Sequence, residues 1–241
     1  MQSRRKFFLL ITGCLAGCFR WVPSLLAKSE DSKKIAQGAC ELTTEAVDGP
    51  YYVDDVFYRS DISEERDGVP LTLRLEVLEK DTCRPIPEAT VDVWHCDALG
   101  NYSGFPGADP DEFPNVRRGA KVTSDLRFCR GRQISDEEGQ VTFQSIFPGW
   151  YTPRTVHIHL KVILNDREML STQIYFPQEL NDAILDKEDP YKERGRSPYR
   201  NKNDGVIKRS GGSTNAWPTT ERAGRSIVAT QTIVVKKLNH G

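Results

Sequence analysis

The sequence predicts an all-β protein: a single β-sandwich domain with long site-bearing loops and one short helix, preceded by an export signal. Short segments in which apolar and polar residues alternate recur along the chain, and polar turns separate them, as between the strands of a sandwich. Only residues 178–187, directly after Pro177, have the pattern of a helix. The length of 241 residues suits one domain with a short leader.

The predicted strands are read from the alternation of apolar residues. Apolar side chains at every second position from Leu71 to Val77 share one side of an extended segment, which predicts that this side is buried. Further strands are expected at residues 90–96, 129–134, 140–146, 155–164 and 226–235. Two long stretches, 97–127 and 187–225, lack a strand pattern, and loops of that length in a compact domain usually carry a site or a partner surface.

The charge of the chain is nearly balanced, with 33 basic and 34 acidic residues. Setting aside Arg4, Arg5 and Lys6 of the leader leaves 30 basic against 34 acidic residues, a net charge of −4. This is an ordinary surface charge, so no nucleic-acid partner is expected.

The first 18 residues have the features of a bacterial export signal. Arg4 and Arg5 precede a short apolar run, a pattern that resembles the twin-arginine signal, and the run is too short to span a membrane. Small residues before Cys18 resemble a lipobox, which predicts a lipid anchor on that cysteine; the alternative is simple cleavage near Ala27. Residues 19–39 are expected to be a polar tether before a domain at 40–241. The protein is therefore expected to be exported, to the periplasm or outside the cytoplasmic membrane.

Four cysteines follow the leader: Cys40, Cys83, Cys96 and Cys129. An even number in an exported chain indicates one or two disulfides, and three pairings are open. The spacings contain no Cys-x-x-Cys pair, so neither a zinc cluster nor a redox motif is expected.

A His-x-His pair is the sharpest local feature. Alternate residues of a strand share a face, with Cα atoms ~7 Å apart. His157 and His159 would therefore point together away from the side occupied by Val156, Ile158 and Leu160. Two imidazoles on one strand face can converge on one metal ion.

Two tyrosines bear on which metal is bound. Tyr151 lies six residues before His157, and Tyr102 lies in the loop that leaves an upstream strand. A free phenol has a pKa near ~10, so binding as phenolate at neutral pH requires a strongly Lewis-acidic cation. Fe(III) meets this requirement better than Zn(II). His95 shares a strand face with Val91 and Val93, so it is expected to be packed rather than a ligand.

Several separated motifs, in one order, carry a resemblance to a known family. They are Trp94-His95-Cys96-Asp97-Ala98-x-Gly100-x-Tyr102-Ser103, Arg130-Gly131-x-Gln133, Gly139-x-Val141-x-Phe143 and Pro148-Gly149-Trp150-Tyr151-x-x-Arg154-x-x-His157-Ile158-His159, with Cys40-Glu41-Leu42-Thr43, Asp48-Gly49-Pro50-Tyr51-Tyr52 and Thr172-Gln173-Ile174-Tyr175-Phe176-Pro177. The pattern resembles the intradiol ring-cleavage dioxygenases, which include protocatechuate 3,4-dioxygenases and catechol 1,2-dioxygenases, and within them a small exported branch. The resemblance covers residues 40–235.

The resemblance implies an Fe(III) cofactor and intradiol cleavage of a catechol by O2 to a cis,cis-muconate-type dicarboxylate. The implied partners are a small aromatic diol and O2. The implied ligands are Tyr102, Tyr151, His157 and His159, of which the first and last stay bound and the other two form an axial pair. Tyr151 would leave the metal to act as a base, Arg154 would stabilise negative charge on the substrate ring, and Gln173 would orient the substrate. Residues 49–52 are expected either in the pocket wall or in a tight turn with buried rings.

Two readings from other classes compete with this interpretation. One is a non-catalytic β-sandwich binding module at the cell surface with a structural metal. The other is a zinc hydrolase built on the histidine pair, which lacks a third ligand and a general base at sensible spacing. The sequence leaves the oligomeric state open, and it leaves open whether the substrate is catechol, protocatechuate, hydroxyquinol or a larger plant-derived catechol.

Overall fold

The computed structural model describes residues 40–114, 121–210 and 215–236. The predicted export signal, the lipobox at Cys18 and the tether at 19–39 lie outside the described residues. Among the helices of the described part, none combines the length and the apolar character needed to span a membrane.

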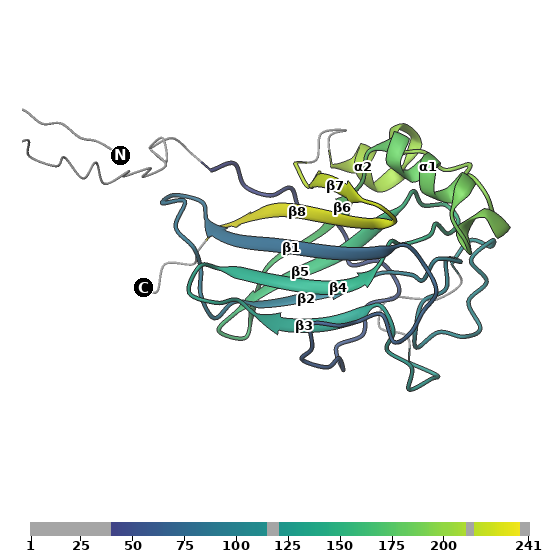
Figure 1. Ribbon diagram of the computed structural model, residues 1–241. Coiled ribbons are helices and arrows are strands. Elements are labelled where there is room, and N and C mark those ends of the chain that lie inside the picture. Colours follow the sequence, from purple (N-terminus) through teal and green to yellow (C-terminus); the bar gives the residue numbers. More distant parts are fainter. Residues whose placement is uncertain (1–39, 115–120, 211–214, 237–241) are drawn as a thin grey trace, which may run out of the picture. The chain divides into compact units, whose positions relative to one another are not determined.

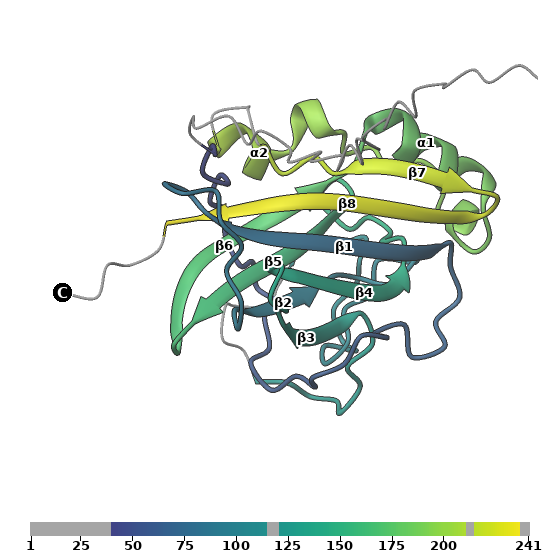
Figure 2. The same ribbon diagram turned by 60° about the vertical axis from the view of Figure 1, so that its left-hand side comes forward.

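Two four-stranded sheets form the described domain, as the two views of Figure 1 and Figure 2 show. One sheet has the order β4-β1-β8-β7 and the other β3-β2-β5-β6. Strand β1 runs parallel to β8, and the other pairs are antiparallel. The bounds are β1 Pro70–Glu79, β2 Thr90–Trp94, β3 Arg130–Ile134, β4 Gln140–Ile146, β5 His157–Leu164, β6 Arg167–Tyr175, β7 Thr219–Ala223 and β8 Ser226–Val235. The predicted all-β sandwich is confirmed.

The core lies between the sheets and follows from the alternation in the sequence. Leu73 and Leu75 of β1 are buried in the same cluster as Ile158 and Leu160 of β5. Removing one such leucine side chain costs ~2–5 kcal/mol, because the surrounding structure fills the cavity only in part. The β5 strand is therefore buried on both faces: one face belongs to this core and the other carries the histidines.

The long stretch at 187–225 is less irregular than predicted. Helix α1 (Gln178–Lys187) is where the sequence predicts a helix, but a second helix, α2 (Gly205–Arg209), and strand β7 follow it. Two 3-10 turns, η1 (Tyr191–Glu193) and η2 (Asn201–Asn203), lie between the helices. A five-residue helix is too short to show an apolar period. Both views place α1 and α2 on the side of the domain where β7 lies (Figure 1).

Strand β6 was also absent from the prediction. It pairs with β5 through a turn at Asn165 and Asp166, both of which have positive φ. Such a turn suits a two-residue hairpin. The strand matters for the site because it brings Gln173 opposite His159.

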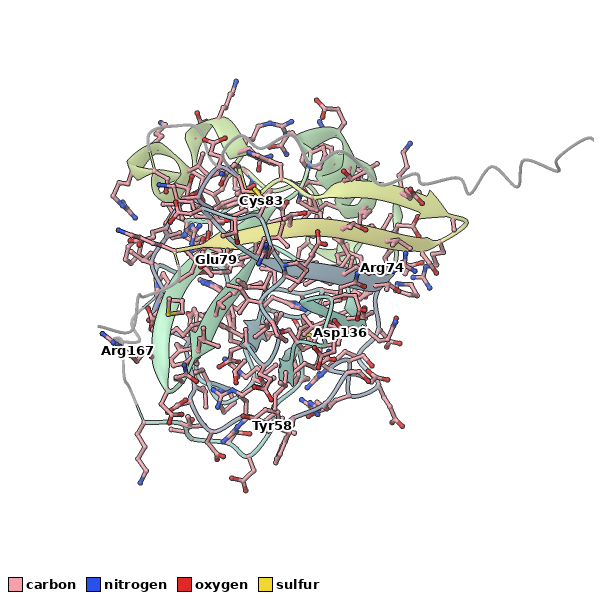
Figure 3. All side chains as sticks on the ribbon, turned by 90° about the vertical axis from the view of Figure 1, so that its left-hand side faces the viewer. Tyr58, Arg74, Glu79, Cys83, Asp136 and Arg167 are labelled. Atoms are coloured by element: carbon pink, nitrogen blue, oxygen red, sulfur yellow. A yellow bond between two sulfur atoms is a disulfide. The ribbon has the colours of Figure 1, made fainter. Side chains whose placement is uncertain are left out.

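Of the four cysteines in the described residues, Cys40 and Cys83 form a disulfide, with Cα atoms 5.7 Å apart. Cys83, labelled in Figure 3, lies in the connection between β1 and β2. Cys96 and Cys129 are buried free thiols. The disulfide fixes the start of the segment that runs from residue 40 to residue 54, which contributes to the site.

Candidate active site

The two histidines of β5 point to one place, as predicted. Both are buried, and their Nε2 atoms are 3.1 Å apart. His157 Nδ1 lies 2.7 Å from the carbonyl of Thr155, which can only accept, so Nδ1 carries the hydrogen and Nε2 keeps its lone pair, with Arg154 Nη1 at 3.4 Å. Burial, helped by the charge of Arg154, lowers the pKa of His157 to about 3, and burial next to His157 holds the pKa of His159 well below its usual range. Both imidazoles are therefore neutral, the form that binds metals.

Two phenols meet the imidazoles. The ring centroids of Tyr102 and Tyr151 are 5.4 Å apart, Tyr151 is 5.5 Å from His157, and Tyr102 is 6.4 Å from His159. Both tyrosines are buried, and burial raises their pKa values, to about 12 for Tyr151 and well above the usual range for Tyr102. Four rings from three separated segments thus surround one small region.

The loop after β2 presents Tyr102 through a tight turn. The carboxylate of Asp97 accepts hydrogen bonds from the backbone N–H groups of Leu99 and Asn101. Gly100 has φ +90°, and a Cβ there would lie 2.3 Å from the carbonyl oxygen of Trp150. Only glycine fits such a close approach with positive φ. The turn therefore joins the Tyr102 loop to the segment that carries Tyr151.

A cavity of about 340 Å³ opens beside Tyr151 and Arg154. Its volume lies at the lower end of the range for small-molecule pockets, ~300–1,000 Å³. Gly49 and Pro50 form part of its wall, and the exposed Phe113 also lines it. The surroundings are mainly apolar, with the buried Arg154 guanidinium, the buried Tyr151 phenol and the exposed Arg209 as polar groups.

Arg154 is held rigidly at this cavity. Its Nε donates to Asp204 Oδ2 at 2.8 Å, and its Nη2 donates to Gln173 Oε1 at 2.6 Å. Burial works against the charges, but the Arg154 guanidinium lowers the pKa of Asp204, while Tyr151 and Asp204 raise the pKa of Arg154. Arg154 is thus a fixed positive charge facing the space where a ligand would bind.

Comparison with known proteins identifies the family. The family model described as dioxygenase matches residues 47–191, more than half of the chain. The solved structure of an intradiol ring-cleavage dioxygenase from Tetranychus urticae is 31% identical, with a TM-score of 0.75, and the match covers 84% of this chain and 98% of that one. The chain belongs to the intradiol ring-cleavage dioxygenases, a family of oxidoreductase enzymes.

Curated relatives agree with this family. A chlorocatechol 1,2-dioxygenase of Rhodococcus opacus is 26% identical over 199 residues, covering 70% of this chain and 67% of its own length. A chlorocatechol 1,2-dioxygenase of Cupriavidus pinatubonensis is 35% identical over 156 residues, covering 61% of this chain and 58% of its own length. This chain thus spans about three fifths to two thirds of these relatives.

The four rings fit the non-haem iron that this family generally uses. The buried Tyr102 Oη has no hydrogen-bond partner among the described residues. Two neutral imidazoles and two phenols give nitrogen and oxygen donors, and a phenol this buried needs a highly charged cation to lose its proton. No group of three or more His, Cys, Asp or Glu side chains in the described part of the chain could hold a metal.

Gln173 is in place, but its amide is engaged by the protein. Its Oε1 also accepts from Tyr175 Oη at 2.9 Å, and its Nε2 donates to the carbonyl of Val47 at 2.7 Å. It is fully buried and is not among the residues that line the 340 Å³ cavity. These bonds orient Arg154 and the Val47 segment, and a direct role of Gln173 on substrate stays a prediction.

Three further residues support the site, of which the sequence interpretation missed Asp204 and left the place of Tyr51 open. Asp204 binds Arg154 and also caps α2 by accepting from the backbone N–H groups of Val206 and Ile207. An aspartate before a helix start is a common capping signal, and it was the available clue. Trp94 stacks on His159, with centroids 4.9 Å apart, and Tyr51 stacks on Tyr102 at 4.3 Å.

Two expectations about neighbouring residues are resolved. The 49–52 run is both pocket wall and buried rings, because Gly49 and Pro50 line the cavity while Tyr51 is buried. His95 is packed and paired, as expected: its ring nitrogens bond the carbonyl of Cys96 and the hydroxyl of Ser145.

Proposed function

We propose that this protein is an Fe(III)-dependent dioxygenase that cleaves a catechol between its two hydroxyl-bearing carbons with O2, giving a cis,cis-muconate-type dicarboxylate. The observation that carries the proposal is the meeting of two neutral imidazoles and two buried phenols beside a cavity with a fixed guanidinium. Membership of the intradiol family supports the same activity.

Tyr102, Tyr151, His157 and His159 would hold the iron. The ferric ion, when bound, would supply the Lewis acidity that favours the catecholate and the electron-accepting character that prepares the ring for O2. The stack of Trp94 on His159 and the hydrogen bond from His157 Nδ1 to the Thr155 carbonyl fix the two imidazoles. Partners of this kind orient metal ligands and set their tautomers.

Tyr151 and Arg154 would act on the substrate. Tyr151 lines the cavity, so its oxygen can take a proton from a substrate hydroxyl. The Arg154 guanidinium would offset negative charge that develops on the ring. A single preorganised donor of this kind is worth ~3–4 kcal/mol, or 10²–10³ in rate. The apolar wall at Gly49 and Pro50 would exclude water from the reacting ring.

The direct test is O2 consumption by the iron-loaded protein with a panel of catechols, together with product identification. Iron-loaded protein is expected to be coloured by phenolate-to-iron charge transfer, and Tyr151→Phe should alter that band and reduce turnover strongly. Tyr58→Phe is the matched control, because Tyr58 is 62% exposed and is not one of the four rings of the site. A colourless, zinc-bearing protein with full activity would refute the proposal, and a coloured protein that consumes no O2 would favour the binding module instead.

We further propose that the protein is exported and anchored by a lipid on Cys18. The signal pattern of residues 1–18 supports this, and the Cys40–Cys83 disulfide suits an oxidising compartment. Cell fractionation with Cys18→Ala should release the protein from the membrane fraction. An unaltered distribution would refute the anchor, and a cytoplasmic location of the unaltered protein would refute export.

A further inference from the structure

A row of charged and polar residues, buried at its two middle positions and half-buried at its ends, crosses the sheet next to the histidines. Arg132 of β3, Asp92 of β2, Lys161 of β5 and Ser171 of β6 pair in register across four neighbouring strands. We call these four residues the charged row. Because side chains alternate along a strand, Lys161 lies on the same face as His159, one step of two residues further along β5.

The charged row binds the segment that covers it. Lys161 Nζ lies 3.2 Å from Asp48 Oδ2, and Ser171 donates to the other oxygen of Asp48. The ammonium also lies 3.9 Å from the centroid of the Tyr52 ring, and the Tyr52 hydroxyl donates to Asp92 at 3.2 Å. The side chains of Lys161 and Asp48 are 6% and 2% exposed. The ammonium also pairs with the half-exposed carboxylate of Glu168 at 2.9 Å, so Lys161 stands between one buried and one partly exposed acid.

The segment that covers the charged row also forms part of the wall of the cavity. Asp48 stands between Val47 and Gly49, both of which line the cavity. Gly49 has φ +72°, and a Cβ there would lie 3.2 Å from Cε1 of His159, so its backbone rests directly against a proposed iron ligand. The Val47 carbonyl accepts from Gln173. Asp48 is therefore the anchor in the middle of the wall.

We propose that Lys161 is a positioning residue for substrate binding, holding the 44–52 segment at the cavity through Asp48 and Tyr52. The inference rests on the proposed function for its kinetic part. A buried ion pair is weak evidence for stability, since apolar residues of similar size often serve the fold as well. A charge buried at the base of a binding wall is instead suited to fixing that wall in one arrangement.

The test compares Lys161→Met with Lys161→Arg in the iron-loaded protein. Lys161→Met is expected to raise KM about tenfold with kcat within about twofold, because it loosens the wall without touching the reacting atoms. Iron content should not change. In the free protein, amide hydrogen exchange at residues 44–52 should become faster. Lys161→Arg, which keeps the positive charge, should have a KM and an amide exchange rate at residues 44–52 close to those of the unaltered protein. Lys192→Met is the matched control, because Lys192 forms an exposed pair with Asp189.

Two results would overturn the proposal. One is a folded Lys161→Met protein whose KM and whose exchange at 44–52 are unchanged. The other is a loss of kcat and iron with KM unchanged, which would make Lys161 a support of the metal site instead. If Lys161→Met does not fold, the double variant Lys161→Met with Asp48→Asn removes both charges of the pair. Its KM and its amide exchange at residues 44–52 are then judged in the same way. Absence of turnover by the unaltered protein would refute the proposed function, while the exchange experiment, which needs no substrate, would still decide whether Lys161 holds the segment.

Discussion

Replacing Asp204 by asparagine tests how Arg154 is held. The aspartate uses both oxygens: Oδ1 accepts from the backbone N–H groups that begin α2, and Oδ2 accepts from Arg154 Nε at 2.8 Å and from the N–H of Thr155 at 3.1 Å. In Asp204→Asn one oxygen remains for the helix cap. The amide NH2 then faces two donors, so the bonds from Arg154 Nε and from the N–H of Thr155 are lost, and Arg154 keeps only the longer bond from Nη2 to Oδ1 at 3.3 Å.

The size of the effect follows from burial. The side chain of Asp204 is 0% exposed and that of Arg154 is 9% exposed, so the substitution leaves a buried guanidinium without its carboxylate. Breaking a buried pair in this way costs ~3–5 kcal/mol. Because the helix cap survives, we expect the lower end, about 3 kcal/mol. A guanidinium displaced from its working position should also lower kcat/KM by about 10²-fold.

Urea denaturation and O2 uptake measure the two effects separately. Asp186→Asn is the control, since Asp186 pairs with Arg196 on the surface and its loss should cost less than about 1 kcal/mol. Thermal or urea stability of Asp204→Asn equal to that of Asp186→Asn, with kcat/KM within about threefold of the unaltered protein, would refute the reasoning. A stability loss without an activity loss would show that Arg154 keeps its position by other contacts.

Three other properties can be measured directly. Burial lowers the pKa of His95 to about 4, below its value of ~6.5 in an unfolded chain. The unfolded state therefore binds this proton first, and the free energy of unfolding should fall by at most about 3 kcal/mol as the pH drops from about 6.5 to 4. Urea denaturation at several pH values measures this fall, and a His95→Gln variant with the same dependence of the free energy of unfolding on pH would contradict the expectation. Reducing the Cys40–Cys83 bond removes a link between residues 43 apart in sequence, worth about 4 kcal/mol on chain-entropy grounds; an unchanged denaturation midpoint in reductant would speak against it. Arg209 lines the cavity and is exposed, so Arg209→Gln should raise the KM of a carboxylate-bearing catechol about fivefold, equivalent to ~1 kcal/mol, and leave that of catechol unchanged; equal changes for both substrates in O2 uptake would exclude a charge effect.

The histidine half of the site could be predicted from residues alone. The period of two in a strand places His157 and His159 on one face, independently of the rest of the chain. In the structure their Nε2 atoms are 3.1 Å apart. Nothing local in the sequence distinguishes Tyr102 from any other buried tyrosine. Its place beside the histidines depends on the turn at Gly100, which is fixed by a contact with the distant Trp150.

The supports of the site could not be predicted, because they are made by segments far apart in sequence. Asp204 reaches Arg154 from 50 residues away, out of a stretch whose helix is only five residues long. The pairing of Cys40 with Cys83 likewise depends on where the first strand connection lies in space. Local alternation predicts strands well, but it carries no information on which loop ends beside which strand.

The two tyrosines are surrounded differently, and this difference suits them to different work if iron occupies the site. Tyr51 stacks on the ring of Tyr102, the Arg130 guanidinium lies 5.7 Å from the centroid of that ring, and Tyr102 is not among the residues that line the 340 Å³ cavity. Tyr151 does line it. A base must come within hydrogen-bond reach of the proton that it takes. Of the two phenols, therefore, Tyr151 is the one placed to meet a substrate hydroxyl from this cavity. Tyr102 is equally buried but borders a separate cavity of about 220 Å³, which suits its proposed role as a permanent ligand.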